Sequence, residues 1–312
     1  MSRLFLGVDG GQSSTTAMVG DETGRIVGFG RGSECNHVKG PEGRTKFINA
    51  INGCIGLTGF QGAQFEAAFL GFSGGPVDKE QLLREMINVT GPMTVTHDGA
   101  IALTGATAGE PGIIMIAGTG SFCYGRNAEG RTARAGGWGY IFGDEGGGYD
   151  ITRQALRAAL RYEEGWGPPT VLLLMLLEAT GEKTANDLMH RFYTVDYPRP
   201  RIASYSKLVD EACQNGDAVA RSVLQAAAQQ LAGFTSAIRG QLFKPGDAAF
   251  IAYIGGVYRS DFLRETFRML VELEDGNVVG SPKLGPAAGA LIEAYRSAGL
   301  NPTLTNLPES EK

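Results

Sequence analysis

The most constraining feature of this chain is a glycine-rich stretch from Gly112 to Tyr149. It opens with an apolar run, residues 113–117, which ends at the turn Gly118–Ser121. A short β-rich run that ends in a glycine turn predicts a buried strand whose backbone amides emerge where an anion can bind. The stretch closes with glycines on both sides of Trp138 and Asp144. Because glycine lets a backbone approach a partner closely, this pattern is typical of a ligand site.

The composition excludes several classes of protein. The 312 residues include 47 glycines, about twice the usual share, without a collagen-like period. The net charge of -5 argues against a general nucleic-acid or membrane surface, so local amides would have to bind any phosphate ligand. We find no signal-peptide pattern and no apolar run long enough to cross a membrane, so a cytoplasmic protein is expected.

The cysteines do not form a metal-binding pattern. There are four of them, with no Cys-x-x-Cys pair, at positions Cys35, Cys54, Cys123 and Cys213. This spacing argues against a zinc or iron–sulfur site within one chain. Reduced thiols scattered through a cytosolic protein are expected instead.

The first hundred residues predict an α/β unit. Short β-rich runs separated by turn residues predict an antiparallel meander, and apolar residues at helical spacing predict crossover helices. The expected strands are 4–9, 16–19, 25–29, 67–72 and 93–97, and the expected helices are 44–57 and 80–88. Residues 1–98 are therefore predicted to form a βββαβαβ unit.

The alternation of strands and glycine turns recurs after Gly112. Gly10 and Gly118 are 108 residues apart, and Gly24 and Gly130 are 106 apart. A nearly constant offset predicts an internal duplication. Residues 99–285 are expected to form a larger second domain with a helical insertion. A helix at about 286–299 is expected to join the first domain, and 300–312 to form a polar tail that adds nothing to the core.

Asp9 stands at the end of the first predicted strand. Because a strand and not a helix follows, a capping role for Asp9 has no helix to cap. We expect its carboxylate to help hold a divalent cation beside phosphates. The donors expected in the adjoining turn are the amides of Gly10 and Gly11 and the hydroxyls of Ser13 and Thr15. With the matching turn at Gly118–Ser121, this arrangement predicts a two-loop clamp for phosphoryl transfer. Neither turn has the spacing or the terminal Lys-Ser/Thr of a P-loop.

Three further side chains have both a structural and a functional interpretation. Asp98 can be a turn residue before a glycine, or a general base that accepts the proton of an alcohol during phosphoryl transfer. Asp144 can be an ordinary loop acid or a bidentate acceptor for vicinal sugar hydroxyls. Trp138 can be a packing anchor or a platform for a sugar ring.

Residues 71–75, Gly-Phe-Ser-Gly-Gly, match the Gly-x-Ser-x-Gly nucleophile elbow of hydrolases. Ser73 would then need a histidine, which would have to be His97 or His190. His97 leaves little room for an intervening acid, and His190 lies on a predicted polar helix. A hydrolase therefore ranks below a phosphotransferase. The segment can also be a glycine turn at a strand–helix corner, or a turn whose amides contact a substrate hydroxyl.

Taken together, these residues resemble the N-acetylglucosamine kinase branch of the BadF/BadG/BcrA/BcrD ATPase family, within the actin-like, Hsp70-like and sugar-kinase superfamily. The motifs span Gly7 to about Tyr295. They are Gly7–Gly11, Asn36–His37, Ser73–Gly75, Thr96–Asp98, Gly118–Ser121, Gly136–Gly139, Gly143–Gly146 and Gly255–Val257.

The resemblance implies an α/β fold of two ribonuclease H-like, actin-like ATPase domains, each with a βββαβαβ core, and a cleft between them that binds ATP. It implies a homodimeric kinase that uses ATP and Mg²⁺ to phosphorylate the 6-hydroxyl of an amino sugar, first of all N-acetylglucosamine. Carried over by motif, Asp98 is the general base and Asp9 acts near Mg²⁺. The implied phosphate-binding residues are Gly10, Gly11, Ser13, Gly118 and Thr119, and Gly255 and Gly256 face the adenosine. The implied sugar-binding residues are Asn36, Gly74, Ser121, Asp144 and Trp138.

Two positions depart from the family pattern. The first turn reads Gly10-Gly11-Gln12-Ser13, where a third glycine followed by threonine is more usual, and Phe122 replaces the asparagine of the animal enzymes. The acceptor therefore stays open among N-acetylglucosamine, glucosamine and N-acetylmuramic acid. An ATPase that activates a redox partner is another alternative, but no cysteine matches its cluster-binding motif. A non-catalytic sugar sensor is less favoured, because no helix-turn-helix extension is present.

Overall fold

The computed structural model describes residues 3–11, 13–35, 38, 40–74 and 76–312. The chain forms two compact units, Met1–Pro111 with Pro282–Lys312, and Gly112–Ser281. The boundary differs from the expected one at 98/99, because helix α3 (Asp98–Thr107) packs against helix α11 (Pro286–Ser297) in the first unit. The apolar α3 was not recognised in the sequence as a helix.

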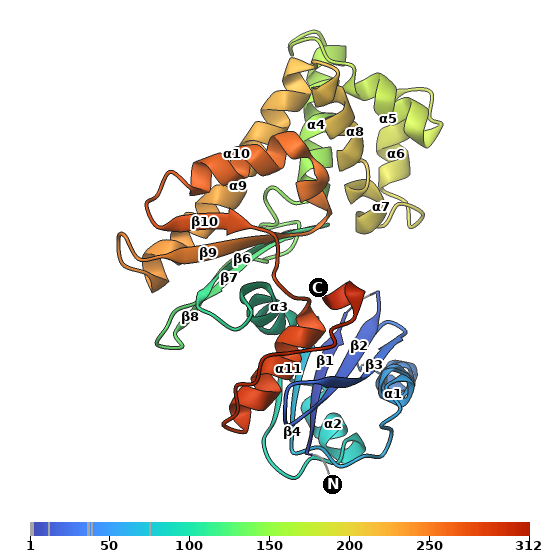
Figure 1. Ribbon diagram of the computed structural model, residues 1–312. Coiled ribbons are helices and arrows are strands. Elements are labelled where there is room, and N and C mark those ends of the chain that lie inside the picture. Colours follow the sequence, from blue (N-terminus) through green and yellow to red (C-terminus); the bar gives the residue numbers. More distant parts are fainter. Residues whose placement is uncertain (1–2, 12, 36–37, 39, 75) are drawn as a thin grey trace. The chain divides into compact units, whose positions relative to one another are not determined.

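The first unit is built on a five-stranded sheet with the order β3-β2-β1-β4-β5 (Figure 1). Its first three strands form the predicted antiparallel meander, and β4 and β5 run parallel to β1. The strands are β1 (Leu4–Gly10), β2 (Thr15–Asp21), β3 (Ile26–Gly32), β4 (Ala67–Phe72) and β5 (Met93–His97). The predicted strand order along the chain is confirmed.

Helices cover both faces of this sheet. Successive strand residues point to opposite faces, so Leu6 and Val8 of β1 pack with helices α1 (Gly40–Leu57) and α2 (Glu80–Met86). Phe5 lies on the other face, in a core with Ala288 and Leu291 of α11. The first unit is therefore a three-layer α/β structure.

The second unit repeats this architecture. Its sheet has the order β10-β9-β6-β7-β8, in which β6, β7 and β8 are antiparallel and β9 and β10 are parallel to β6. The strands are β6 (Gly112–Ala117), β7 (Ser121–Arg126), β8 (Thr132–Gly136), β9 (Ala249–Ile254) and β10 (Asn277–Gly280). The equivalent order confirms the predicted pair of βββαβαβ cores.

The expected helical insertion lies between β8 and β9. Its helices are α4 (Gly148–Glu163), α5 (Leu172–Thr180), α6 (Ala185–Phe192), α7 (Arg199–Ala203), α8 (Ser206–Gln214) and α9 (Ala218–Leu242), and α10 (Asp261–Val271) follows β9. Our sequence analysis expected a helical insertion here but did not predict α7 and α8 within it. Pro200 lies in the first turn of α7, where proline is tolerated because the first amides of a helix have no intrahelical partner. None of the described helices is long and apolar enough to cross a bilayer.

The expectation of a polar C-terminal tail is wrong. Thr305 exchanges backbone hydrogen bonds with the turn before β3, accepting from Ile26 and donating to Gly24, each at 3.0 Å. Leu304 and Leu307 pack against the core of the first unit. Glu311 is buried, and its Oε2 accepts from the Ala288 amide at 3.1 Å. Only the folded structure brings these scattered leucines to an apolar face.

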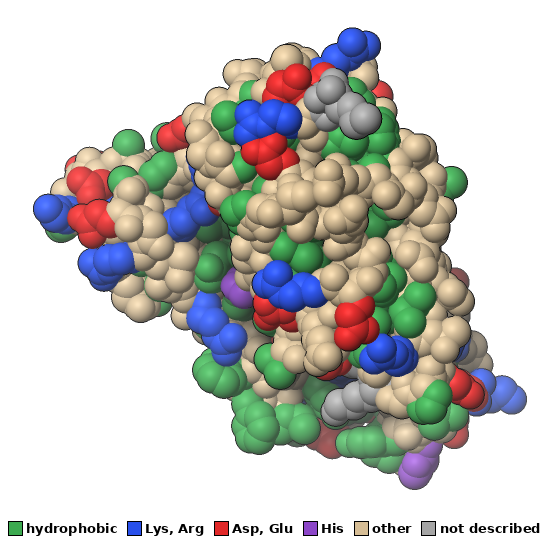
Figure 2. Space-filling view, turned by 90° about the horizontal axis from the view of Figure 1, so that it is seen from below, with side chains coloured by type: hydrophobic (Ala, Val, Ile, Leu, Met, Phe, Trp, Pro, Cys, Tyr) green, Lys and Arg blue, Asp and Glu red, His purple; other side chains and the backbone are tan. Residues whose placement is uncertain are grey.

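The surface carries charges of both signs. On the face that Figure 2 shows, Lys and Arg side chains are interspersed with Asp and Glu. This distribution follows from the similar totals of 28 basic and 33 acidic residues.

Helices α3 and α11 meet through glycines. A Cβ on Gly289 of α11 would lie 2.1 Å from the carbonyl oxygen of Ile101 and 2.4 Å from the amide nitrogen of Gly105, both on α3. Since both neighbours are backbone atoms, no side chain can rotate away to make room. This contact sets the distance between the two helices.

We expect Gly289→Ala to destabilise the first unit by about 1–3 kcal/mol, the usual scale of overpacking. Gly53→Ala in α1 is the matched control, because a Cβ there would meet no atom within 4 Å. Helix propensity alone should make that variant about 0.5–1 kcal/mol more stable. Thermal unfolding of both variants measures the difference, and an equal or higher melting temperature for Gly289→Ala would contradict the close contact.

Candidate functional site

In the first unit, three strand ends bring candidate residues to one edge of the sheet. Gly10 of β1 is in register with Phe72 of β4, which is in register with His97 of β5. The residues that follow, Ser73 and Asp98, therefore emerge at the same carboxyl edge, where ligands of open α/β sheets bind. The Ser73 amide donates to the Gly10 carbonyl at 3.0 Å.

Asp98 is the first residue of α3, and the structure replaces the turn interpretation with a helix start. Its half-buried carboxylate accepts two hydrogen bonds. Oδ2 accepts from the Ser73 hydroxyl at 2.6 Å, and Oδ1 accepts from the Gly99 amide at 2.9 Å. The carboxylate is thus held in one orientation at the sheet edge.

Asp9 lies near the same edge, at the end of β1. The pKa of Asp9 is raised to about 7, mainly by burial and also by the charges of Glu311 and Asp98, while Arg31 opposes the shift. The described residues contain no group of three or more His, Cys, Asp or Glu able to hold a metal. Mg²⁺ commonly binds one or two carboxylates together with phosphates and water, so a single carboxylate among negative charges fits this ion.

The first glycine turn is shaped by its own backbone. The Gly11 amide donates to the Ser14 carbonyl at 2.9 Å, and a Cβ on Gly10 would lie 2.1 Å from the Phe72 ring. Ser13 is exposed and available to a ligand. Thr15 is fully buried in β2, so the expectation that its hydroxyl binds phosphate is wrong.

The second glycine turn is tied to helix α4. The Gly118 amide donates to the Gly120 carbonyl at 2.9 Å, so Gly118 shapes the turn internally. The carbonyls of Gly118 and Thr119 accept from the amides of Gly148 and Tyr149 at 2.8 and 3.0 Å. These bonds join the turn to the first residues of α4.

A cavity of about 480 Å³ adjoins this turn, within the size range of small-molecule sites. Gly118 and Thr119 line it together with Gly256. Gly255 makes this proximity possible, because a Cβ there would lie 2.3 Å from the Ala117 carbonyl oxygen and its φ is +117°. The structure therefore brings the predicted phosphate turn and the predicted adenosine residues to one place.

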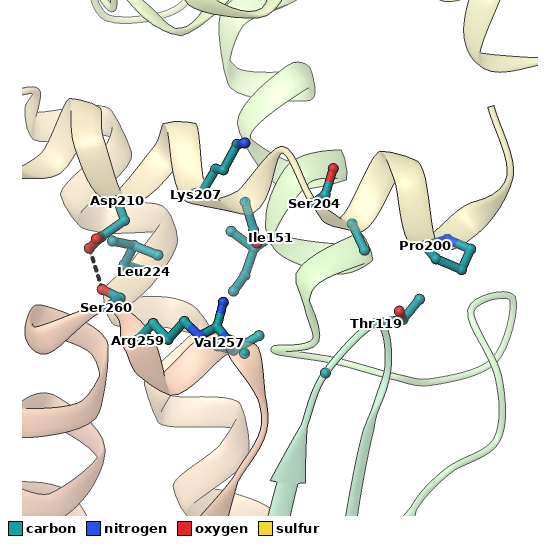
Figure 3. A pocket seen from close by; sticks show the side chains of 14 residues that line it. Thr119, Ile151, Pro200, Ser204, Lys207, Asp210, Leu224, Val257, Arg259 and Ser260 are labelled. Atoms are coloured by element: carbon teal, nitrogen blue, oxygen red, sulfur yellow. Dashed lines mark hydrogen bonds between the residues drawn. The ribbon is translucent and has the colours of Figure 1, made fainter. Parts of the chain in front are cut away.

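The cavity also contains residues that our sequence analysis missed. Figure 3 shows Lys207 on α8 and Arg259, the last residue of the short helix η1 (Gly256–Arg259), on opposite sides of the space. The Ser260 hydroxyl donates to the Asp210 carboxylate beside them. The apolar lining includes Ile151, Leu224 and Val257. Arg259 could have been found from the sequence, because it lies close to the Gly255-Gly256 pair. Lys207 could not, because its helix, α8, was not predicted.

The expected sugar-binding residues of the second unit belong to one loop cluster. Asp144 has a φ of +62°, an uncommon conformation for a residue with a side chain. Its carboxylate lies against Gly120, where a Cβ would be 2.5 Å from Asp144 Cγ. The buried Ser121 hydroxyl donates to the Glu145 carbonyl at 2.6 Å, so Ser121 positions the loop.

Trp138 is 67% exposed, and the Arg134 guanidinium lies 4.9 Å from its ring centroid. This exposure argues against the interpretation of Trp138 as a core packing anchor. In the first unit, Gly74 is exposed with a φ of +80°, next to Ser73. Asn36 lies outside the described residues.

The four cysteines are free, and three of them are buried. Burial raises the pKa of Cys35 to about 11 and of Cys54 to about 12. At neutral pH these buried thiols are therefore protonated in the absence of a metal.

A model of the BadF/BadG/BcrA/BcrD ATPase family matches residues 6–294. The chain belongs to this family. It is 33% identical over 300 residues to an N-acetylmuramic acid/N-acetylglucosamine kinase from Clostridium acetobutylicum, covering 94% of this chain and 98% of that protein. It is 27% identical to an N-acetyl-D-glucosamine kinase from Dictyostelium discoideum, with the same coverage. The family predicted from the motifs is confirmed.

Solved structures support the fold of this family member. A candidate N-acetylglucosamine kinase from Chromobacterium violaceum superposes with a TM-score of 0.69 at 24% identity, over 93% of this chain and 98% of that one. A ROK family glucokinase from Streptomyces griseus gives a TM-score of 0.51 at 22% identity, over 93% and 98% of the two chains. The chain has the two-domain, actin-like ATPase fold.

The raised pKa of Asp9 predicts a pH-dependent effect on stability. In the unfolded chain Asp9 ionises near its ordinary value of 3.8, whereas in the folded protein it ionises near 7. Between these values the unfolded state loses its proton first, so Asp9 lowers stability as pH rises from 4 to 7. We expect Asp9→Asn, without nucleotide or divalent cation, to be on the order of 2–4 kcal/mol more stable than wild type at pH 8. The difference should vanish near pH 4.

Asp21 in β2 supplies a control of opposite sign. The Thr23 hydroxyl donates to its carboxylate at 2.6 Å and lowers the pKa of Asp21. Asp21→Asn should therefore be less stable than wild type at pH 8 and closer to it in acid. Thermal unfolding at pH 4 and pH 8 measures both variants, and a destabilised Asp9→Asn at pH 8 would contradict the unfavourable burial of this carboxylate.

Proposed function

We propose that this chain is an ATP-dependent kinase of amino sugars that transfers a phosphoryl group to the 6-hydroxyl of N-acetylglucosamine. The observation that carries the proposal is the cavity in which Gly118 and Thr119 meet Gly256. Two glycine turns that are more than a hundred residues apart in the sequence line one site of nucleotide size. The full-length relationship to a kinase of N-acetylmuramic acid and N-acetylglucosamine supports the choice of substrate class.

In this proposal the cavity binds ATP. Ile151, Leu224 and Val257 offer apolar contact to a purine, and Arg259 can lie over its face. Lys207 adds a second positive charge. The Gly118–Ser121 turn holds the phosphates.

Asp9 would hold Mg²⁺ in the first unit, aided by the exposed Ser13 of the adjoining turn. When bound, Mg²⁺ would supply the positive charge that neutralises negative charge developing on the phosphates during transfer. Burial and the charges of Glu311 and Asp98 raise the pKa of Asp9, and a cation at this site would favour its ionised form.

Asp98 would accept the proton of the sugar hydroxyl. Its carboxylate is half-buried at the sheet edge, and each oxygen accepts one hydrogen bond from the protein. Since a carboxylate offers about four acceptor sites, capacity remains for the substrate hydroxyl. Phosphoryl transfer requires mainly positioning and charge neutralisation, and an oriented base serves the first requirement.

The sugar would contact the loop of the second unit that contains Trp138 and Asp144. The Asp144 carboxylate can accept from two vicinal hydroxyls, and the exposed Trp138 ring can stack on a sugar face. Both relatives that match over their full length are kinases of N-acetylglucosamine, one of them also of N-acetylmuramic acid, which supports N-acetylglucosamine as the first substrate to test.

A coupled assay of ADP release with these three sugars tests the proposed function. We expect turnover with N-acetylglucosamine that depends on both ATP and Mg²⁺. A preference for another of the sugars would change the substrate but keep the reaction. Activity with none of them, together with ATP hydrolysis that requires a protein partner, would overturn the proposal and favour the redox ATPase.

We expect Asp98→Asn to lose roughly 10²-fold or more of kcat, the usual scale for a general base, while the affinity for sugar is retained. Asp261→Asn is the control, because Asp261 is likewise the first residue of a helix but its side chain is 80% exposed and pairs only with Arg264. Near-wild-type turnover of Asp98→Asn would contradict the assignment of the base.

Arg259→Ala should raise the KM for ATP about 10-fold and leave the KM for sugar unchanged, because a desolvated cation–π contact contributes about 1–2 kcal/mol. The control is Arg268→Ala in α10, where the guanidinium pairs with Glu272 on the surface at 3.1 Å. Steady-state kinetics with each substrate varied in turn measures both. Equal changes in the two KM values would argue against a nucleotide contact.

A further inference from the structure

The Ser73 hydroxyl has a partner that neither the hydrolase motif nor the proposed kinase role explains. Its Oγ donates to Oδ2 of Asp98 at 2.6 Å. A serine nucleophile requires a base, usually a histidine, that takes its proton during attack. Here the acceptor is the carboxylate proposed as the base for another hydroxyl, that of the sugar.

The fold enforces this contact. Ser73 and Asp98 each follow directly on the paired residues Phe72 and His97 of two parallel strands, so their positions match along the sheet edge. Helix α3 is held against β4 at the same end, because Gly71 leaves room for the Ile101 side chain, which a Cβ would approach to 2.6 Å. The hydrogen bond therefore follows from register and packing.

Ser73 also connects the base to the first phosphate turn. Its amide donates to the Gly10 carbonyl at 3.0 Å while its hydroxyl donates to Asp98. One residue thus fixes the distance between the Gly10–Gly11 turn and the catalytic carboxylate. The exposed Gly74, with its φ of +80°, lets the chain turn away immediately afterwards.

The Ser73 bond complements the one from Gly99. With Oδ1 bonded to the Gly99 amide and Oδ2 to Ser73, rotation of the carboxylate breaks at least one bond. A lone bond from Gly99 would leave the Oδ2 side free to turn. Small misplacements of a reacting group reduce turnover strongly. Loss of the hydrogen bond from Ser73 should therefore lower kcat.

We propose that Ser73 is a positioning residue that orients Asp98 toward the acceptor hydroxyl and links it to the phosphate turn. This inference rests on the proposed kinase function. It assigns the Gly-x-Ser-x-Gly segment a role in phosphoryl transfer and excludes Ser73 as a nucleophile.

The test compares kcat and KM for Ser73→Ala, Ser73→Thr and the control Ser297→Ala. Ser297 is in the same unit, and its hydroxyl donates only to the Ala294 carbonyl, at 2.8 Å, near the end of α11. We expect Ser73→Ala to lose about 10- to 100-fold of kcat, the scale of a mispositioned group, with both KM values within about twofold. Ser73→Thr retains the hydroxyl and should recover part of kcat, and Ser297→Ala should match wild type.

A double variant separates positioning from general destabilisation. If Ser73 acts only through Asp98, then Ser73→Ala combined with Asp98→Asn should be no slower than Asp98→Asn alone, because residues that act as a unit are not additive. Multiplied losses in the double variant would overturn the inference, as would normal kcat in Ser73→Ala.

Two outcomes distinguish this inference from the proposed function. A wild-type chain inactive on every sugar would overturn both, whereas an active wild type with a fully active Ser73→Ala would overturn only the role of Ser73. A fluorophosphonate probe should leave Ser73 unmodified. Stoichiometric labelling at Ser73 would mark it as a nucleophile and overturn the positioning role.

Discussion

The close approach of one backbone segment to another at the strand ends is the contact on which both candidate sites depend. In the second unit, Gly255 lies so near the Ala117 carbonyl that any side chain would collide with it. That approach brings Gly256 beside the Gly118–Thr119 turn. In the first unit, Gly10 has no room for a side chain either, because a Cβ there would lie 2.1 Å from the Phe72 ring. The absence of a Cβ is what lets distant segments share a site.

The two units carry different electrostatic chemistry. The first concentrates carboxylates, with Asp9 close enough to Glu311 and Asp98 for their charges to raise its pKa. The cavity of the second contains the cations Lys207 and Arg259. Carboxylates favour a cation and Lys and Arg side chains favour an anion, so the two units differ in the charge of the ligand that each can stabilise.

Local sequence patterns predicted the strands well, since β-rich runs bounded by glycine turns leave little choice of structure. The misses have physical reasons. Helix α7 was hidden by Pro200, which breaks a helix in its interior but not in its first turn. The C-terminal segment was dismissed because its leucines have no period, and only contact with β3 and α11 makes them part of a core.

The sequence by itself determined the pair of βββαβαβ cores, because β-rich runs and glycine turns depend on local spacing, and its motifs indicated the family. The tertiary structure decided which groups meet. It buried Thr15, assigned the Ser121 hydroxyl to the Glu145 carbonyl, and placed Lys207 and Arg259 in the cavity beside the Gly118–Thr119 turn. It also paired Ser73 with Asp98. Such contacts depend on strand register and helix packing between segments far apart in the chain, which no local pattern encodes.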